Sequence, residues 1–361
     1  NSNKVVIAYA DGGNSSYGTA IVGTVSGTSI SFGTAVIFRS NSSQYISATF
    51  DTTSNKVVIA YSSTGNVLGS AIVGTVSGTG ISFGSETVWE STAYQTTKSV
   101  VYDASSNRVV IAYRDDGDSN KGKAIVGTVS GTSISFGSKV VFEAGSTETC
   151  QIVYDSTNSK VVIVYKDAGD SNKGKAVIGT VSGTSISFNT ATVFYDTANF
   201  QNASASYNSN AGAVVISFSG ASSHGIVLAG TTTSSSITFG SPLTITTNTY
   251  SASHASSVYD STAKKIVLLY NDGSDSGNGK SVVYSTSATT LTAENYIGIT
   301  NGVVDEGTSS QALGSAAVFE SAQSTQIGSA YDSTNNKVVV AYTDDADSYK
   351  GKAVVGTVDT S

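Results

Sequence analysis

Seven copies of one short apolar phrase recur along the chain at a nearly constant spacing, and this regularity limits the fold more than any other feature. The copies are NKVVIAY at 3–9 and 55–61, NRVVIAY at 107–113, SKVVIVY at 159–165, GAVVISF at 212–218, KKIVLLY at 264–270 and NKVVVAY at 336–342. Their closing aromatics are 52 or 53 residues apart, except for a last interval of 72 residues. A repeat of roughly this length indicates a propeller or a related repeat architecture.

Each repeat divides into four short segments, which we name strands A to D. In the third repeat these are SVVYD (99–103), RVVIAYRD (108–115), KAIVGTV (123–129) and SISFGSKVVF (133–142). Strands B and C are apolar at nearly every position, which is typical of strands buried on both faces. Sheets covered on both sides by neighbouring sheets pack radially. We therefore predict an all-β fold: one seven-bladed β-propeller of four-stranded antiparallel blades, with repeats of about 52 residues, over residues 1–361.

The composition supports an all-β chain and argues against two classes of function. Of 361 residues, 19 are Tyr and only one is Pro, and β-branched residues outnumber good helix formers. No run of about 18 apolar residues occurs, so we expect no membrane span. The net charge is −7, and the basic residues are scattered, whereas a nucleic-acid binder gathers them on one face. We therefore expect no nucleic-acid partner.

Two features interrupt the regular pattern. The chain begins in a strand B and ends after a strand C, so the first repeat lacks strand A and the last lacks strand D. Residues 299–314 lengthen the sixth repeat and are expected to form an insertion. This segment could supply a missing strand, cover a sheet edge or dock another molecule, since sheet edges usually need protection.

The strand order places the B–C loops and the D–A segments on one face of the ring. The D–A segments differ from repeat to repeat and carry aromatic and amide side chains. Divergent loops on a uniform scaffold usually carry recognition, although relaxed surface drift would give the same pattern. The A–B turns are uniform, and we interpret their aspartates as turn chemistry. The predicted ligand-binding residues are Tyr45, Trp89, Tyr94, Gln95, Phe200, Gln201 and Tyr250.

The B–C loops carry a recurring pair of acids. Clustered carboxylates suit Ca²⁺, which takes six to eight oxygen ligands, so Ca²⁺ is a possible cofactor. The alternative is a set of turns and hairpin ion pairs, because Lys123, Lys175, Lys280 and Lys352 lie close enough to neutralise the acids. The predicted metal ligands are Asp115, Asp118, Asp167, Asp170, Asp272, Asp275, Asp344 and Asp347.

Catalytic signals are weak in this sequence. His224 and His254 are isolated, and no cluster of His, Cys and acidic residues has metal-ligand spacing. The paired acids recur in several repeats, whereas an active site needs one unique constellation. We therefore predict that the chain is not an enzyme. A carbohydrate-active enzyme is a lesser alternative, because one fold can host many functions.

The stretch NKVVIAYADGGNSSYGTAIVGTVSGTSISFGTAVIF at 3–38 resembles repeat regions of bacteriophage structural and tail-fibre-like proteins, as does LTAENYIGITNG at 291–302. The resemblance implies an extracellular or virion-surface location. It implies binding to a cell-surface glycan or receptor, or to other virion or surface proteins, through the B–C and D–A face. The expected function is a non-enzymatic recognition or adhesion module. The alternative is a structural or assembly protein in which the propeller is a rigid docking hub or spacer.

Overall fold

The computed structural model describes residues 3–63, 68–91, 95–197, 200–246, 250–272, 277–287, 290–297, 324–345 and 347–358. The expected insertion at 299–314 lies outside these residues. Within them the chain is all-β, with two short 3-10 turns at Gly12–Asn14 and Ala221–Ser223. No helix of the described part is long and apolar enough to cross a membrane.

Among the described residues, fourteen strands precede Ala168. They are β1 (Lys4–Asp11), β2 (Tyr17–Ser26), β3 (Ser29–Phe32), β4 (Val36–Asp51), β5 (Lys56–Ser63), β6 (Leu68–Ser77), β7 (Gly80–Phe83), β8 (Thr87–Glu90), β9 (Gln95–Asp103), β10 (Arg108–Asp115), β11 (Lys121–Ser130), β12 (Ser133–Phe136), β13 (Val140–Asp155) and β14 (Lys160–Asp167).

The second half continues the pattern. Its strands are β15 (Lys173–Ser182), β16 (Ser185–Phe188), β17 (Thr192–Tyr195), β18 (Gln201–Asn208), β19 (Ala213–Ser219), β20 (Gly225–Thr232), β21 (Ile237–Phe239), β22 (Leu243–Thr246), β23 (Tyr250–Asp260), β24 (Lys265–Asp272), β25 (Asn278–Ser287), β26 (Thr290–Ile297), β27 (Ser324–Asp332), β28 (Lys337–Asp344) and β29 (Lys350–Gly356).

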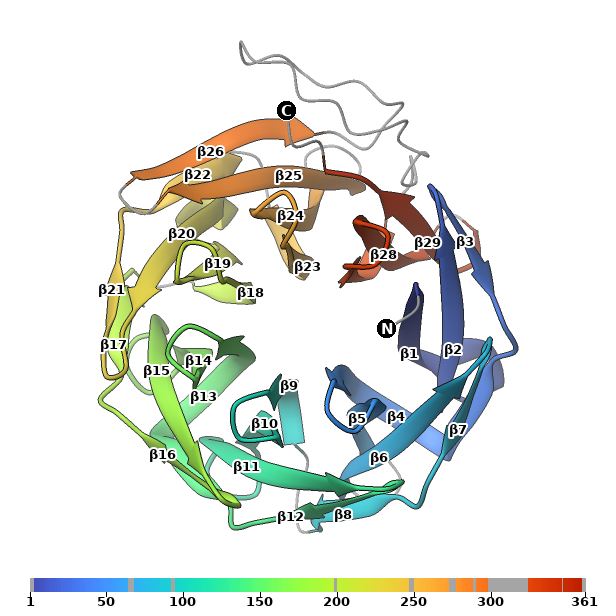
Figure 1. The fold of residues 1–361 in the computed structure, drawn as a ribbon. Helices are drawn as coiled ribbons and strands as arrows, with labels where there is room; N and C mark the ends of the chain where they lie inside the picture. The colour runs from blue at the N-terminus through green and yellow to red at the C-terminus, as the bar shows by residue number, and fades with distance from the viewer. Residues whose placement is uncertain are drawn as a thin grey trace.

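These strands form antiparallel sheets that stand one after another around a central opening (Figure 1). The strands β9, β18 and β23 lie next to the opening, and β12, β17, β21 and β26 lie at the outside of the ring (Figure 1). This is the arrangement of a β-propeller. The all-β, propeller-type prediction is therefore confirmed.

Two D–A segments are continuous strands rather than loops. The first part of β4 pairs with β2, and the rest pairs with β5 of the next sheet. Strand β13 joins β11 to β14 in the same way. These segments are rich in residues that favour strands. The backbone therefore stays hydrogen-bonded as it passes from one sheet to the next. The predicted strand D at 133–142 is also two strands, because β12 and the start of β13 pair with opposite ends of β11.

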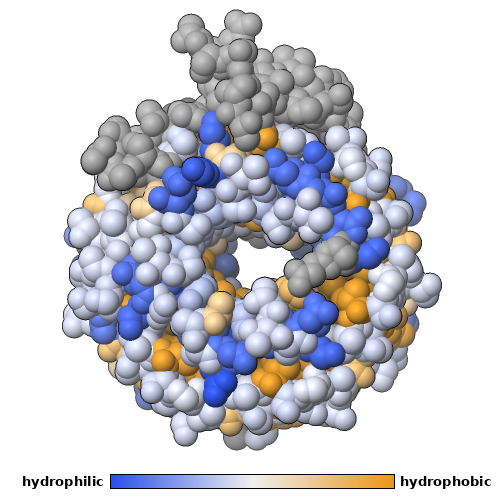
Figure 2. All heavy atoms as spheres, in the orientation of Figure 1, coloured by the Kyte–Doolittle hydropathy of each residue, from blue (hydrophilic) through white to orange (hydrophobic). Residues whose placement is uncertain are grey.

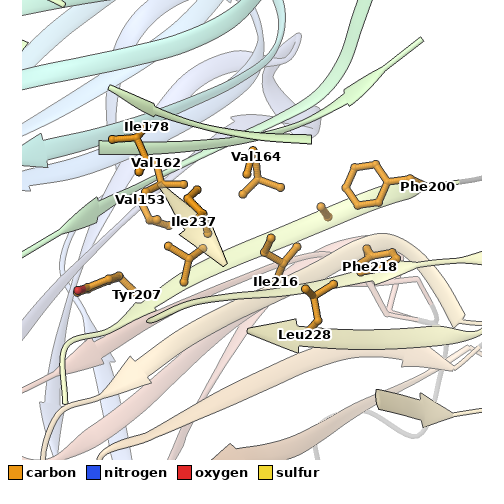
Figure 3. Close-up of a cluster of buried hydrophobic side chains, with 13 residues drawn as sticks. Val153, Val162, Val164, Ile178, Phe200, Tyr207, Ile216, Phe218, Leu228 and Ile237 are labelled. Atoms are coloured by element: carbon orange, nitrogen blue, oxygen red, sulfur yellow. The ribbon is translucent and has the colours of Figure 1, made fainter. Parts of the chain in front are cut away.

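Alternate residues of each strand B face opposite neighbours, as their apolar runs predict. On β14, Val161 and Ile163 lie in one core cluster with residues of β10, while Val162 and Val164 lie in another with β19. Figure 3 shows the second cluster, in which Phe218 packs with the β14 valines. Each fully buried aliphatic side chain contributes about 1.5–3 kcal/mol, so the stability of the ring comes largely from contacts between sheets.

The two ends of the described chain meet through side chains. Val5 and Val25 of the first sheet form a buried cluster with Val339 of β28 and Val355 of β29. Among the strand pairs of the described residues, none joins β1 or β2 to β28 or β29. Contact between the first and last sheets therefore depends on apolar packing.

The A–B turns have the chemistry that the sequence predicts. The Oδ1 atom of Asp155 accepts hydrogen bonds from the amides of Thr157 and Asn158, both at 3.0 Å. The equivalent aspartates of the other repeats, such as Asp260, cap their turns in the same way. These residues fix the face of the ring opposite to the B–C loops.

Candidate functional site

The predicted metal ligands of the B–C loops are engaged by lysines. Buried Asp115 accepts a hydrogen bond from Lys123 at 2.8 Å, and the same ammonium lies 2.8 Å from Asp118. Hydrogen bonds from Lys123 and Lys121 lower the pKa of Asp118 to about 2. The β14–β15 hairpin has the same arrangement. The Nζ atom of Lys175 lies 2.6 Å from a carboxylate oxygen of Asp167 and 2.9 Å from one of Asp170. The remaining described pairs are Lys280 with Asp272, and Lys352 with Asp344 and Asp347.

These ion pairs do not fit a calcium centre. An ammonium group already lies against each inner carboxylate, so a cation there would have to displace it. In the part of the chain that the structure describes, no group of three or more His, Cys, Asp or Glu side chains could hold a metal ion. Asp275 lies outside that part. The Ca²⁺ site remains a prediction from the sequence, and the geometry favours the alternative of hairpin ion pairs.

Two of the predicted ligand-binding aromatics belong to the core. The Trp89 ring packs against Tyr113 and Phe136, with centroid distances of 6.4 and 5.5 Å. Phe200 is fully buried and lies 5.0 Å from Phe218. Both rings are buried between sheets and are closed to a ligand.

The other predicted ligand-binding residues divide into three groups. Gln201 is exposed and lines a small polar cavity of about 240 Å³ together with Ser219 and Ser222. Tyr45 is 46% exposed. Tyr94 lies outside the described residues, as do the side chains of Gln95 and Tyr250. The structure therefore does not bring the predicted set together into one surface.

Five of the inner strands carry a bulge at the same place. The register of β4, β9, β13, β18 and β27 against the partner strand shifts there by one residue, since two bulge residues oppose a single residue of the partner. The first bulge residue has a positive φ wherever it is described. It is Tyr45, Thr149, Asn202 or Gln326, with φ of 50° or 51°. The second points into the sheet-to-sheet core and is small or apolar: Ile46, Cys150, Ala203 and Ile327.

In β9 the second bulge position holds Lys98, and this breaks the repeat. Its register shift lies between the pairs Ala112–Ser99 and Arg114–Thr96, so Lys98 aligns with the buried Cys150 of the next repeat. Lys98 is nevertheless only 7% exposed. A buried lysine is costly unless its surroundings compensate, so its presence at an otherwise apolar position points to a specific role.

The ammonium group of Lys98 contacts the neighbouring sheet. Its Nζ atom donates a hydrogen bond to the Oγ atom of Ser62, at the end of β5, and lies 5.4 Å from the centroid of the Tyr45 ring. Desolvation lowers the pKa of Lys98 to about 7, and the charge of Asp116 opposes this fall in part. An amine with such a pKa is about half in its basic, neutral form at pH 7, so it can act as a base there.

The sequence around Ser62 is also exceptional among the repeats. Five of the seven copies have Asp at the position of Ser63, as in Asp115 of β10. Ser63 is instead buried and accepts a hydrogen bond from Arg39 at 3.1 Å. This repeat therefore lacks the Asp–Lys pair that the third and fourth repeats have, and Ser62 and Lys98 form a contact that the other described repeats do not contain.

A string of charged side chains continues from this contact into the next two sheets. The Nε atom of Arg114 donates to Asp116 at 2.7 Å, and its Nη1 atom lies 4.0 Å from Glu148. Lys166 donates to Glu148 at 2.8 Å. Asp116 and Glu148 are thus each paired with a basic side chain. Strongly hydrophilic residues form separate groups around the opening (Figure 2).

The chemistry of the Ser62–Lys98 contact is that of a hydroxyl group beside a basic amine. Such a pair can activate an oxygen nucleophile, as in serine–lysine variants of the catalytic triad. We did not predict it from the sequence. The signal was present, because aligning QTTKSVV with TETCQIV puts Lys98 where the other repeats have a small or apolar residue.

Comparisons with known proteins show the fold of this chain and no family. No family model and no curated protein matches the sequence. A protein from Lactobacillus plantarum is similar in structure, with a TM-score of 0.60 and 11% identity over 99% of this chain and 96% of its own. The periplasmic gluconolactonase of Pseudomonas aeruginosa has a TM-score of 0.59 and 10% identity, over 98% of this chain and 95% of its own.

These matches correct three predictions. The resemblance to phage structural proteins is wrong as a guide to kinship, because the similar structures are a Lactobacillus protein and a bacterial periplasmic enzyme. The prediction of a non-enzymatic adhesion module, with its alternative of a structural hub, is wrong for the same reason. The prediction that the chain is not an enzyme is also wrong, since one of the structurally similar proteins is named a gluconolactonase. Repeats rich in Gly, Ser, Thr and Val satisfy the same blade packing in unrelated proteins, so a similar repeat sequence does not indicate a common family.

Proposed function

We propose that this chain is a hydrolase that cleaves small carboxylic esters or lactones, with Lys98 as the general base. The observation that carries the proposal is the hydrogen bond between buried Lys98 and Ser62, at a place where the repeat pattern breaks. An active site must be unique in a ring of similar repeats, and this contact is unique among the described ones. A lactone is an apt substrate class because the structurally similar Pseudomonas protein is named a gluconolactonase.

Lys98 is suited to take a proton from an attacking oxygen. Its pKa of about 7 makes the neutral amine the main form above neutral pH, and its Nζ atom is in hydrogen-bond contact with the Ser62 hydroxyl. General-base catalysis by a positioned side chain contributes about 10²–10⁴-fold to a rate. Tyr45 is the exposed group beside this amine. We propose that the Tyr45 ring borders the entrance by which a small substrate reaches Lys98 and Ser62.

A panel of aldonolactones and p-nitrophenyl esters tests the proposal. We expect hydrolysis above the buffer rate, rising with pH through about 7 as Lys98 loses its proton. Lys98→Met is expected to lower kcat/KM by a hundredfold or more. Lys121→Met is the matched control, because Lys121 is a half-exposed lysine paired with Asp118 away from this contact. No hydrolysis of any substrate, or equal rates in both variants, would contradict the proposal.

The blade count is part of the same proposal. We infer seven blades of about 52 residues in one domain over 1–361. Seven antiparallel pairs support this count: β1–β2, β5–β6, β10–β11, β14–β15, β19–β20, β24–β25 and β28–β29. An electron-microscopy projection along the ring axis with any other number of sheets would overturn it. A location outside the cytoplasm is the corresponding proposal, supported by the periplasmic protein of similar structure.

A further inference from the structure

We propose that the inner edge of β1 is a docking site for an extended segment of a partner polypeptide. The segment adds to the first sheet as its innermost strand, antiparallel to β1, and carries Tyr-Asp at its end. Addition of a strand to an exposed sheet edge is a common mode of peptide recognition. The inference is independent of the proposed hydrolase, because it concerns a different surface, on the wall of the central opening.

Strand β1 has a pairing strand on one side only. In the other sheets an inner strand pairs with each strand B, in the pairs β4–β5, β9–β10, β13–β14, β18–β19, β23–β24 and β27–β28. Among the described residues, β1 pairs with β2 alone. It lies between β2 and the opening (Figure 1), and the centre of the ring is open (Figure 2). Alternate amides and carbonyls of β1 therefore point toward open space, and such an edge is a template for another strand.

The chain itself shows what kind of segment this edge accepts. Residues 3–9 and 55–61 have the same sequence, NKVVIAY. The second copy lies in β5, where the inner part of β4 pairs with its edge. The Ile-Ala-Tyr side chains are fully buried there, and Tyr61 is 0% exposed. The same three side chains of β1 are partly exposed, Tyr9 among them. An identical strand that is covered in one sheet and uncovered in another indicates that the β1 edge suits the same kind of inner strand.

The inner strands share a tyrosine whose hydroxyl joins two neighbouring turns. The Tyr102 hydroxyl of β9 lies 2.6 Å from the Oγ1 atom of Thr53, in the turn of the preceding sheet, and donates to the Oδ1 atom of Asn107 at 2.9 Å, in its own turn. Tyr331 of β27 makes the equivalent two contacts at 2.8 and 2.7 Å. A tyrosine at this position therefore fixes an inner strand at its end.

The equivalents of both hydrogen-bonding groups are present beside the β1 edge. Asn3 aligns with Asn107, and the two have nearly the same positive φ, 51° and 55°. Thr334 of the last sheet aligns with Thr53, and the last sheet adjoins the first through the cluster that contains Val5. A docked strand with tyrosine opposite Val5 would thus meet the turn groups that hold Tyr102.

The charge at the start of β1 favours an acid as the last residue of the docked strand. In five of the six described pairs, an aspartate at the end of the inner strand stands opposite a base: Asp51–Lys56, Asp103–Arg108, Asp155–Lys160, Asp260–Lys265 and Asp332–Lys337. Lys4 is the corresponding base of β1, and no described residue stands opposite it on this edge. A carboxylate complements this charge, so the partner segment ends in Tyr-Asp.

A synthetic peptide copied from an inner strand tests the docking site on the full chain. The probe is STQIGSAYDST, residues 324–334, with an N-terminal fluorophore, and fluorescence anisotropy is expected to show saturable binding. The Tyr331→Phe peptide, numbered as in the chain, is expected to bind about threefold to tenfold more weakly, because it loses the hydroxyl contacts. A peptide with proline at both Ser329 and Ala330 is expected not to bind, since proline has no amide to donate to the ladder.

A charge reversal places the peptide on β1. Lys4→Glu is expected to weaken binding of the natural peptide about twofold to fivefold and to favour the Asp332→Lys peptide instead. Lys56→Glu is the matched control, because Lys56 starts the identical sequence in β5, whose edge β4 already covers. Amide hydrogen exchange of the natural chain gives a readout without any variant. The peptide is expected to slow exchange in residues 4–11 and to leave residues 56–63 unchanged.

The contrary outcomes identify what covers the edge instead. Absence of saturable binding, equal binding of the proline peptide, or protection outside β1 would overturn the proposal. If β1 amides in the free monomer are already as protected as those of β5, another part of the same chain covers the edge and the proposal fails. If that protection appears only in a dimer detected by analytical ultracentrifugation, the occupant is a second copy and the proposal also fails. Presence or absence of hydrolase activity bears on none of these results.

Discussion

Replacing Lys98 by methionine is expected to stabilise the fold at neutral and acidic pH, although it removes the proposed base. The ordinary pKa of a lysine is 10.5, and burial lowers that of Lys98 to about 7. One pKa unit corresponds to about 1.4 kcal/mol, so keeping this lysine charged in the fold costs on the order of 5 kcal/mol. The hydrogen bond to Ser62 and the ring of Tyr45 return about 1 kcal/mol each. The expected net gain is about 2–3 kcal/mol.

The pH dependence of this gain follows from the direction of the pKa change. Below pH 7 the amine is protonated in both the folded and unfolded states, so the full cost is present. Between pH 7 and 10.5 the unfolded chain binds more protons than the folded one, and the stability of the natural protein rises with pH. The advantage of Lys98→Met therefore shrinks toward zero as the pH rises from 7 to about 9–10.

Urea unfolding at pH 6 and pH 9 measures the effect, with Lys121→Met as the control. Lys121 is half exposed and its ion pair is worth at most about 1 kcal/mol, so that variant is expected to change little at either pH. A natural protein more stable than Lys98→Met at pH 6 would refute the reasoning. A gain that is equal at both pH values would also refute it, since the effect would then come from packing alone.

Three further predictions concern the loops and the core. Lys123→Met leaves buried Asp115 without its ammonium and is expected to cost about 3 kcal/mol in urea unfolding; a loss no larger than that of Lys121→Met would show that the pair is not buried in solution. Phe200→Ala is expected to lower the free energy of unfolding by about 3–5 kcal/mol, whereas Gln201→Ala is expected to change it by no more than about 0.5 kcal/mol. Similar losses for both variants would show that Phe200 is not buried in solution. EDTA is expected to leave the melting temperature unchanged because lysines neutralise the loop acids, and a clear fall would support bound Ca²⁺.

The strand pattern was readable from the sequence because it depends on local chemistry that repeats. The runs RVVIAY and KVVIVY are apolar on both faces, and the structure buries Val161 and Val162 against opposite neighbours. Asp155 before its turn was readable for the same reason, since a side-chain oxygen beside turn amides needs no tertiary context. The sheet change within β13 was not readable, because it depends on which neighbouring strand is free to pair.

The candidate site was mostly not readable, because exposure depends on direction as well as on residue type. Trp89 on β8 and Phe200 just before β18 are aromatic residues of the kind found in binding surfaces, but the packing of the sheets buries both side chains in the core. The acids of the B–C loops have the composition of a metal site, but the facing lysines decide their role. Lys98 was visible as a departure from its repeat equivalents. Its partner Ser62 belongs to a different repeat, and only the packing of β9 against the sheet of β5 brings the two together.

The titration of Lys98 tests the central claim most directly. Heteronuclear NMR of the lysine Cε and Nζ atoms, with Lys98→Met to assign the signal, follows the charge of this one amine in the folded protein. The account predicts a transition near pH 7. A transition near 10.5 would mean that Lys98 is charged and solvated at neutral pH, and neither the base nor the proposed hydrolase would remain supported.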